Sequence, residues 1–295
     1  MLINEVKLIQ LFCEIDDFCG VYEQKLVGHL LPVNPKSKHS TNKPGISLSE
    51  MMTIEILYHL SGHKCFEYFY RQEVLQGGLR SYFPHAPSYN RFVELKPRML
   101  VALIGYLHCL RLGRLPGLYY ADSTALKVCH QRRIHSHRVF ARSAKTGMSS
   151  TGWFYGFKLF LVVNGLGELV QAFVTPANVA DNALATLKRL FKGLTGLAFA
   201  DKGFASPQKA FPLLYEQGLK LITYIRSNMK NKLVLLQEKM LLKKRGMIES
   251  VIDILKSVCN IEHTRHRSGL NMIVNTYAAL CAYSTFERKP SIFIH

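Results

Sequence analysis

Negative charge is scarce in this sequence. Its 295 residues include 20 Asp and Glu against 38 Lys and Arg, which gives a formal net charge of +18 and a pI near 9.7. Between Ser123 and Gly167 there is no Asp or Glu at all. The basic residues that accumulate there are Lys127, Arg132, Arg133, Arg138, Arg142, Lys145 and Lys158. In a globular protein such a bias favours a polyanionic partner.

Two further tracts are rich in basic residues, one between Arg226 and Arg245 and one in the segment HTRHRS at 263–268. A solvated surface is the ordinary interpretation of a charge run. Three such tracts in one chain favour nucleic acid, because each Lys or Arg that contacts a phosphate releases a counterion and adds affinity. The predicted DNA-binding residues of these tracts are Arg132, Arg133, Arg138, Lys145, Arg245, Arg265 and Arg267.

Three other features are missing. No apolar run reaches the roughly 18 residues of a membrane helix, and the start shows no signal cleavage site, so we expect a cytoplasmic protein with no membrane partner. The seven cysteines include no C-x-x-C pair, and their odd number does not suit a disulfide framework. Zinc binding by His63 with Cys65, or by Cys129 with His130, is disfavoured because neither pair has a matching second pair.

Residues 1–112 carry helical periodicity and few strand signals, and the segment RLGRLPG marks a boundary after them. Ser47 and Glu50 fit a capping box at one helix start, and Ser88 stands where a third helix would begin. We predict an all-helical N-terminal domain over 1–112. A helix-turn-helix-like DNA-binding module and a plain helical support both fit this pattern.

Over residues 113–295 strands alternate with helices. GLYYADS predicts a strand ending at Asp122, and WFYGFKLFLVV with ELVQAFVT predicts a hairpin around 164–167. A helix capped by Asp181, a strand ending at Asp201, a helix with Pro207 in its first turn, a strand LKLITYIR and a helix GMIESVIDILKSV follow. This order predicts an α/β domain with a mixed sheet flanked by helices.

Three acids stand out in that order. Asp122 and Asp201 end strands, where ligands of open sheets bind, and Glu249 lies on the polar face of the last helix. Two-metal phosphoryl transfer requires carboxylates from separate elements. Taken singly, each has a plainer explanation, since an Asp after a strand often caps a turn and a helical Glu often forms a surface ion pair. The competing acids are Asp253, Asp181 and Glu168.

At these residues the sequence resembles the DDE transposases of insertion sequences, which have a ribonuclease H-like catalytic domain, and in particular the IS-nine-eight-two family. The resemblance covers nearly the whole chain, through the segments FCEIDDFC, YYADST, GWFYGFKL, TPANVADN, ADKGF, KKRGMIES and IEHTRHRS. It implies that Asp122, Asp201 and Glu249 are the catalytic acids and hold Mg²⁺, which Mn²⁺ can replace.

The resemblance also implies a DNA substrate, with recognition of terminal inverted repeats, joining to target DNA, and a homodimer on paired DNA ends. Arg245, Glu249 and Lys256 are similar to the R-x3-E-x6-K signature of related transposases, in which the Arg and Lys contact the DNA end. The upstream position where related groups often carry Tyr is Leu242 here.

One departure from the family is Phe160, at a position where we expect histidine. It keeps open the alternative of a decayed copy that binds DNA without cutting it. A ribonuclease H-like nuclease that cuts without strand transfer is a further alternative. The retention of all three acids favours the active enzyme.

Overall fold

A computed structural model describes residues 4–27, 45–149, 152–206, 213, 216–224, 235–262 and 266–293. The chain forms two compact units. One contains the chain up to Leu110, together with Ser257–Ile261 and Leu270–Tyr283, and the other contains the remaining residues from Arg111 onward. The two units therefore differ from the predicted division into 1–112 and 113–295, because two later segments belong to the first unit.

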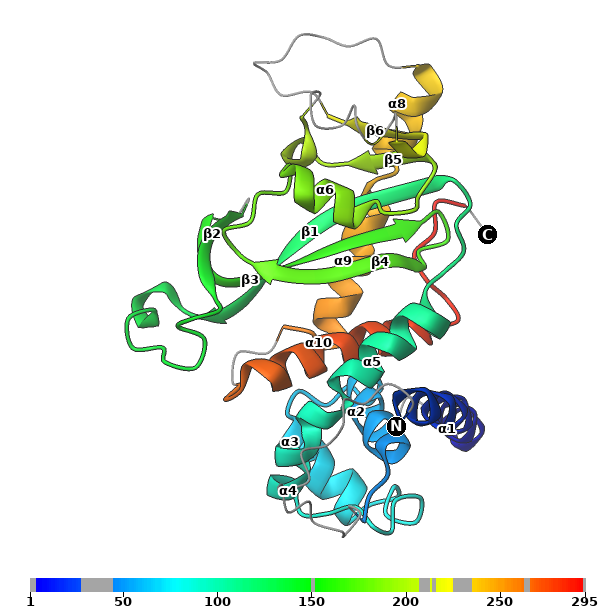
Figure 1. Cartoon of the computed structure of the whole chain (residues 1–295), viewed down its shortest axis with the longest axis vertical. Helices are drawn as coiled ribbons and strands as arrows, with labels where there is room; N and C mark the ends of the chain where they lie inside the picture. Colours follow the sequence, from blue (N-terminus) through cyan, green and yellow to red (C-terminus); the bar gives the residue numbers. More distant parts are fainter. Residues whose placement is uncertain are drawn as a thin grey trace. The chain divides into compact units, whose positions relative to one another are not determined.

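Every regular element described in the first unit is helical (Figure 1). The α-helices are α1 (Glu5–Val27), α2 (Leu48–Leu60), α3 (Phe66–Phe69), α4 (Tyr89–Leu95), α5 (Leu100–Tyr106) and α10 (Gly269–Ser284). Short π-helical or 3₁₀ segments extend three of them, at Tyr70–Leu75, Lys96–Met99 and Leu107–Arg111. Within the part of the chain that the structure describes, no helix is long and apolar enough to cross a membrane.

Two helix starts lie where the sequence predicts them. The Ser47 hydroxyl accepts a hydrogen bond from the Glu50 amide at 3.0 Å, and the Glu50 carboxylate accepts one from the Ser47 amide at 2.7 Å. This capping box satisfies backbone donors that the first turn of α2 leaves free. Helix α4 begins directly after Ser88. Both predicted starts are confirmed.

A buried ion pair lies inside the first unit. The Lys96 ammonium is 2.8 Å from the carboxylate of Glu55, which is fully buried on α2, and it also lies over the ring of Phe66. Burial lowers the pKa of Lys96, and the neighbouring carboxylate partly offsets that effect. Removing either partner would leave the other charge buried and unpaired.

We therefore expect Lys96→Met to destabilise the protein by roughly 3–5 kcal/mol, since an isolated Glu55 carboxylate would remain in the core. Urea denaturation measures this loss. The double variant Glu55→Leu with Lys96→Met removes both charges and is the matched control. It should lose clearly less stability, and an equal loss in the two variants would contradict an electrostatic origin.

The second unit is built on a six-stranded mixed sheet. Its strands are β1 (Leu118–Cys129), β2 (Lys145–Ser149), β3 (Gly152–Asn164), β4 (Leu169–Pro176), β5 (Gly196–Ala200) and β6 (Leu219–Thr223). The order is β2-β3-β1-β5-β6, and β4 pairs with β3. Strands β1, β5 and β6 run parallel, whereas β3 is antiparallel to β1.

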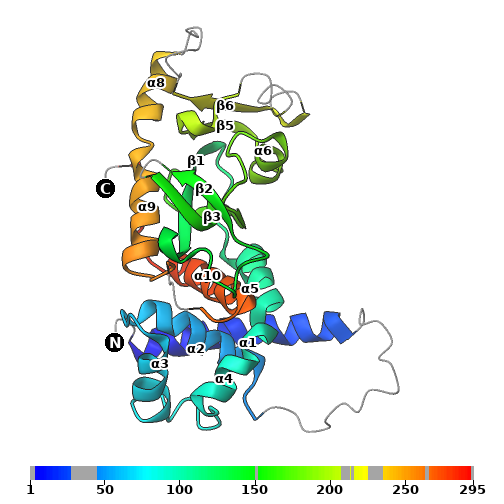
Figure 2. The same ribbon diagram turned by 90° about the vertical axis from the view of Figure 1, so that its left-hand side faces the viewer.

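Helices flank this sheet on both sides, as Figure 2 shows, with α6 (Leu184–Leu190) on one face and α9 (Gly246–Ser257) on the other. Helix α8 (Leu236–Lys243) precedes α9, and short 3₁₀ turns lie at Gln131–Arg133 and Lys202–Phe204. The side chains of alternate β1 residues, Tyr119 and Ala121, join the buried cluster beneath α6. The predicted α/β sheet with flanking helices is confirmed, and its arrangement is consistent with a ribonuclease H-like domain.

The structure corrects three details of the predicted strands and helices. Strand β1 does not end at Asp122 but continues to Cys129, because its second half pairs with β3. Strand β2 was not predicted. Helix α6 begins after Ala183 rather than after a capping Asp181, whose carboxylate has other partners. The predicted hairpin of β3 and β4 is present. Of the helix predicted around Pro207, most lies outside the described residues.

Candidate active site

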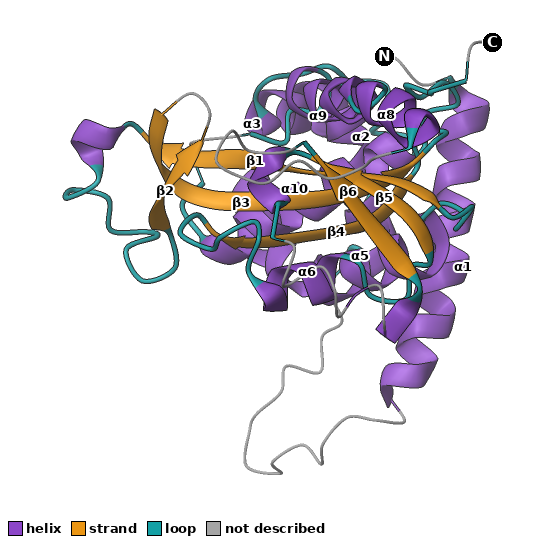
Figure 3. Ribbon diagram, turned by 90° about the horizontal axis from the view of Figure 1, so that it is seen from above, coloured by secondary structure: helices purple, strands orange, loops and turns teal. Residues whose placement is uncertain are grey.

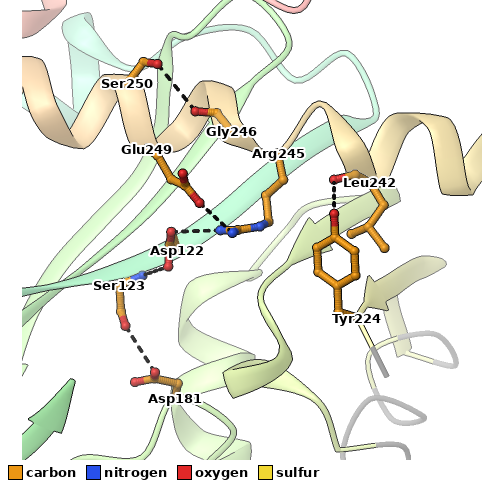
Figure 4. Close-up of polar contacts among 9 residues, drawn as sticks. All are labelled: Asp122, Ser123, Asp181, Tyr224, Leu242, Arg245, Gly246, Glu249 and Ser250. Carbon is orange, nitrogen blue, oxygen red and sulfur yellow. Dashed lines mark hydrogen bonds and ion pairs between the residues drawn. The ribbon is translucent and has the colours of Figure 1, made fainter. Parts of the chain in front are cut away.

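Asp122 occupies the middle of a central strand. It pairs with Leu161 of β3, and the next residue of β1, Ser123, has its side chain on the opposite face. Because Ala121 faces the cluster beneath α6, alternation directs Asp122 toward the face that carries α9. Figure 4 shows the carboxylate turned toward this helix. Pairing with β3 at this residue, and with β5 up to the residue before it, fixes the backbone that carries the acid.

A single guanidinium connects two of the three predicted acids. Arg245, directly before α9, donates from Nη1 to the Asp122 carboxylate at 3.1 Å and from Nη2 to the Glu249 carboxylate at 2.6 Å (Figure 4). The side chains of Arg245 and Asp122 are only 14% and 18% exposed, whereas that of Glu249 is 60% exposed. The start of α9 brings Arg245 and Glu249 together, because the turn that leads into the helix places residues four apart on the same side.

Asp201 enters the same region from the neighbouring strand. Parallel pairing of β5 with β1 sets Ala200 opposite Ala121, so Asp201 and Asp122 directly follow a pair of neighbouring residues in the sheet. Its side chain makes no capping hydrogen bond to the short 3₁₀ turn that follows. The predicted strand ending at Asp201 is present, and it ends one residue earlier, at Ala200.

The electrostatics of Asp122 reflect this gathering of acids. The pKa of Asp122 is raised from an ordinary value of 3.8 to about 6, and burial is the largest cause. Within this net change, the Ser123 amide and the Arg245 guanidinium lower the pKa, whereas the charges of Asp201 and Glu249 contribute to raising it. Asp122 thus senses the charges of both other acids, although the three come from separate elements.

The residues that could hold a metal have the right donor chemistry. Asp122, Asp201 and Glu249 offer carboxylate oxygens, which are the ligands that Mg²⁺ and Mn²⁺ prefer. Among the residues that the structure describes, no three His, Cys, Asp or Glu side chains are grouped closely enough to enclose a metal ion. Arg245 instead provides the positive charge between Asp122 and Glu249.

The competing acids have other partners. Asp181 accepts hydrogen bonds from Lys158 of β3 at 2.8 Å and from the Ser123 hydroxyl at 3.2 Å, so it lies behind β1 on the face opposite Asp122. Glu168 accepts from the Asn164 amide at 2.7 Å in the β3–β4 turn. Asp253 is exposed one turn beyond Glu249. The contact of Asp181 with Ser123 was not foreseen from the sequence.

The predicted DNA-contacting residues are spread over the second unit. Lys256 lies eleven residues along α9 from Arg245, about 16 Å by helical rise, and pairs with Glu262 at 3.3 Å. The residues that are exposed beyond the sheet core are Arg132, Arg133, Arg138, Lys145 and Arg267. Arg265 lies outside the described residues.

The structure shows the surroundings of the two residues that depart from the family pattern, Phe160 and Leu242. Phe160 is fully buried on the α6 side of the sheet, where it stacks on Phe173 and meets the edge of Phe204. Its register partner is Ser123, so the ring points away from the face that carries Asp122. Beside Leu242 lies the side chain of Tyr224, whose hydroxyl donates to the Leu242 carbonyl at 3.4 Å (Figure 4).

Comparison with known proteins agrees with this arrangement. The family described as Transposase DDE domain matches residues 112–269, which is more than half of the chain. This match identifies a transposase domain, with DNA as its implied substrate. The chain belongs to the DDE transposase domain family. No curated protein matches the sequence.

The raised pKa of Asp122 predicts a pH-dependent stability in buffer without divalent metal. The folded carboxyl holds its proton more tightly than the unfolded one, so its contribution to stability is complete below about pH 4 and lost as the pH rises through 6. Asp122→Asn should therefore be the more stable protein at pH 8, by at most about 3 kcal/mol. Denaturation across this pH range measures the difference.

The matched control is Asp253→Asn, which neutralises an exposed acid on α9 and should leave the pH profile unchanged. A profile for Asp122→Asn that runs parallel to that of the parent would show that Asp122 has no raised pKa in the folded protein.

Proposed function

We propose that this protein is the DNA transposase of a bacterial insertion sequence of the IS-nine-eight-two type, which cuts the element ends and joins them to target DNA. The observation that carries the proposal is the contact of Arg245 with both Asp122 of β1 and Glu249 of α9, next to strand β5, whose end leads directly into Asp201. Separate rigid elements supply each acid, as two-metal phosphodiester transfer requires.

In this mechanism Asp122, Asp201 and Glu249 would hold the Mg²⁺ ions through their carboxylate oxygens. When bound, the ions supply Lewis-acid stabilisation of the reacting phosphate and a nucleophile from water or a terminal 3′-hydroxyl. The chain itself fixes the directions of the acids, because Asp122 is set in a paired strand and Glu249 lies on a helix packed on the sheet.

Arg245 has a second role in the proposal. Its fork of N–H donors suits phosphate as well as carboxylate, and it is the cation that directly contacts two of the acids. We therefore assign to Arg245 a contact with a phosphate near the cleaved bond. Lys256 and the exposed arginines after β1 contact phosphates further away. A homodimer would hold the two element ends, and the helical first unit would take part in recognising the terminal repeats.

Cleavage and strand transfer test the catalytic assignment. The substrate is DNA carrying the element's own end, with Mg²⁺ or Mn²⁺ and a supercoiled target. Asp122→Ala, Asp201→Ala and Glu249→Ala should each lower product formation by at least about a hundredfold, since loss of a metal ligand costs more than loss of its outer partner. Asp253→Ala, one turn along the same helix, is the control and should remain active.

The products also separate the alternatives. A parent that cuts but never joins DNA would be a nuclease, and one that binds the end without metal-dependent products would be a decayed copy. Full activity in any of the three alanine variants would remove that residue from the catalytic set.

DNA binding tests the assignment of Arg245. Arg245→Gln should weaken binding of the element end and reduce the slope of log K against log salt by about 1, because one phosphate contact is lost. The control is Lys188→Gln on α6, which removes an exposed charge from the other face of the sheet. Equal salt slopes for Arg245→Gln and the parent would show that Arg245 serves the carboxylates alone.

A further inference from the structure

A basic projection extends from the sheet, beyond α6 and α9 (Figures 1 and 3). It consists of the end of β1, the following loop and the hairpin of β2 with β3, and we call residues 127–149 and 152–156 the basic arm. Gly156 lies at the base of the arm and allows β3 to approach β1 closely there, since a side chain at this position would clash with the Leu126 carbonyl. The arm is thus an extension of the same strand that carries Asp122.

The loop of the basic arm is packed against its hairpin. Phe140 is buried, meets Phe157 edge-on at 5.7 Å and stacks with His137 at 5.6 Å. The Tyr155 hydroxyl donates to the Phe140 carbonyl, and the Gln131 side chain donates to the Trp153 carbonyl. These contacts give the arm a small core of its own, so the side chains on its surface have a defined arrangement.

Two large apolar side chains remain uncovered on this surface. Trp153 is 61% exposed and Met148 is 63% exposed. They are register partners on β3 and β2, so their side chains lie next to each other on one face. Covering such side chains with a partner would be favourable, because it removes apolar surface from water. Trp153 is also the single tryptophan of the chain.

Charge decides which partner could cover this pair. The exposed cations of the arm are Lys127, Arg132, Arg133, Arg138, Arg142 and Lys145. No acid lies between Ser123 and Gly167 to offset them. A second copy of the chain would bring the same positive surface and be repelled. DNA offers both complements, since its phosphates attract the cations and its base faces stack on aromatic rings.

We propose that Trp153, supported by Met148, stacks against an unpaired or unstacked base of the DNA substrate, while the arginines of the basic arm hold the flanking phosphates. The inference rests on the proposed function and adds a base contact to it. Eight residues of β3 separate Trp153 from Leu161, the partner of Asp122. At about 3.3 Å per residue this is at most about 26 Å, or roughly eight base pairs from the acids.

Intrinsic fluorescence tests the contact directly, because all tryptophan emission comes from Trp153. The probes are two labelled duplexes of one sequence, fully paired or with a single unpaired base, titrated without divalent metal so that nothing is cut. Label anisotropy reports binding. We expect the duplex with the unpaired base to quench the emission more strongly. Unchanged emission at saturating concentrations of both duplexes would overturn the inference.

Variants complete the test. Trp153→Ala should bind the duplex with the unpaired base roughly tenfold more weakly or worse, with little change for the paired duplex, whereas Trp153→Phe should keep most of the affinity. Val139→Ala, an exposed apolar residue of the same arm, is the control. Equal weakening by Trp153→Ala on both duplexes would overturn the stacking contact, as would a change only in self-association measured by light scattering.

The two proposals fail in different experiments. A parent that forms no metal-dependent products but shows the fluorescence change overturns the transposase mechanism and supports the base contact. A parent that cuts and joins DNA with unaltered tryptophan emission keeps the mechanism and overturns the base contact. Absence of any DNA binding overturns both.

Discussion

The two hydrogen bonds of the Arg245 guanidinium join the sheet to the helix at the place where the acids meet. Asp122 belongs to β1 and Glu249 to α9, and like charges so close would repel without a cation between them. Arg245 lies four residues before Glu249, so one turn of helix places both the cation and its second partner. The position of α9 on the sheet therefore determines whether Arg245 can reach Asp122.

Burial of Asp122 makes this arrangement demanding. Its carboxyl is largely removed from water, which raises its pKa, and one charged donor alone does not restore the ordinary value. The protein tolerates that cost at a central strand held by neighbours on both edges. On the opposite face of β1, the neighbouring residue Ser123 is also held in place, because its hydroxyl donates to Asp181, which in turn accepts from Lys158. Positional precision for Asp122 is thus obtained at the expense of stability.

Much of this could be predicted from the sequence, where local patterns are strong. The capping box at Ser47, the β3–β4 hairpin and the amphipathic helix α9 depend on short-range signals and are present. The predicted end of β1 was wrong. The residues after Asp122 remain in the strand because they pair with β3, and no local sequence pattern reveals that pairing. Asp181 was misplaced for a related reason, because its partners lie on β1 and β3.

The first unit is made of segments that lie far apart in the chain, and this separation affects when the unit can fold during synthesis. Helix α10, most of whose side chains are buried, belongs with helices made more than 150 residues earlier. Until α10 leaves the ribosome, the early helices lack an apolar partner, so this unit completes its core last. A chain that stops before α10 would expose that surface and be removed by proteolysis.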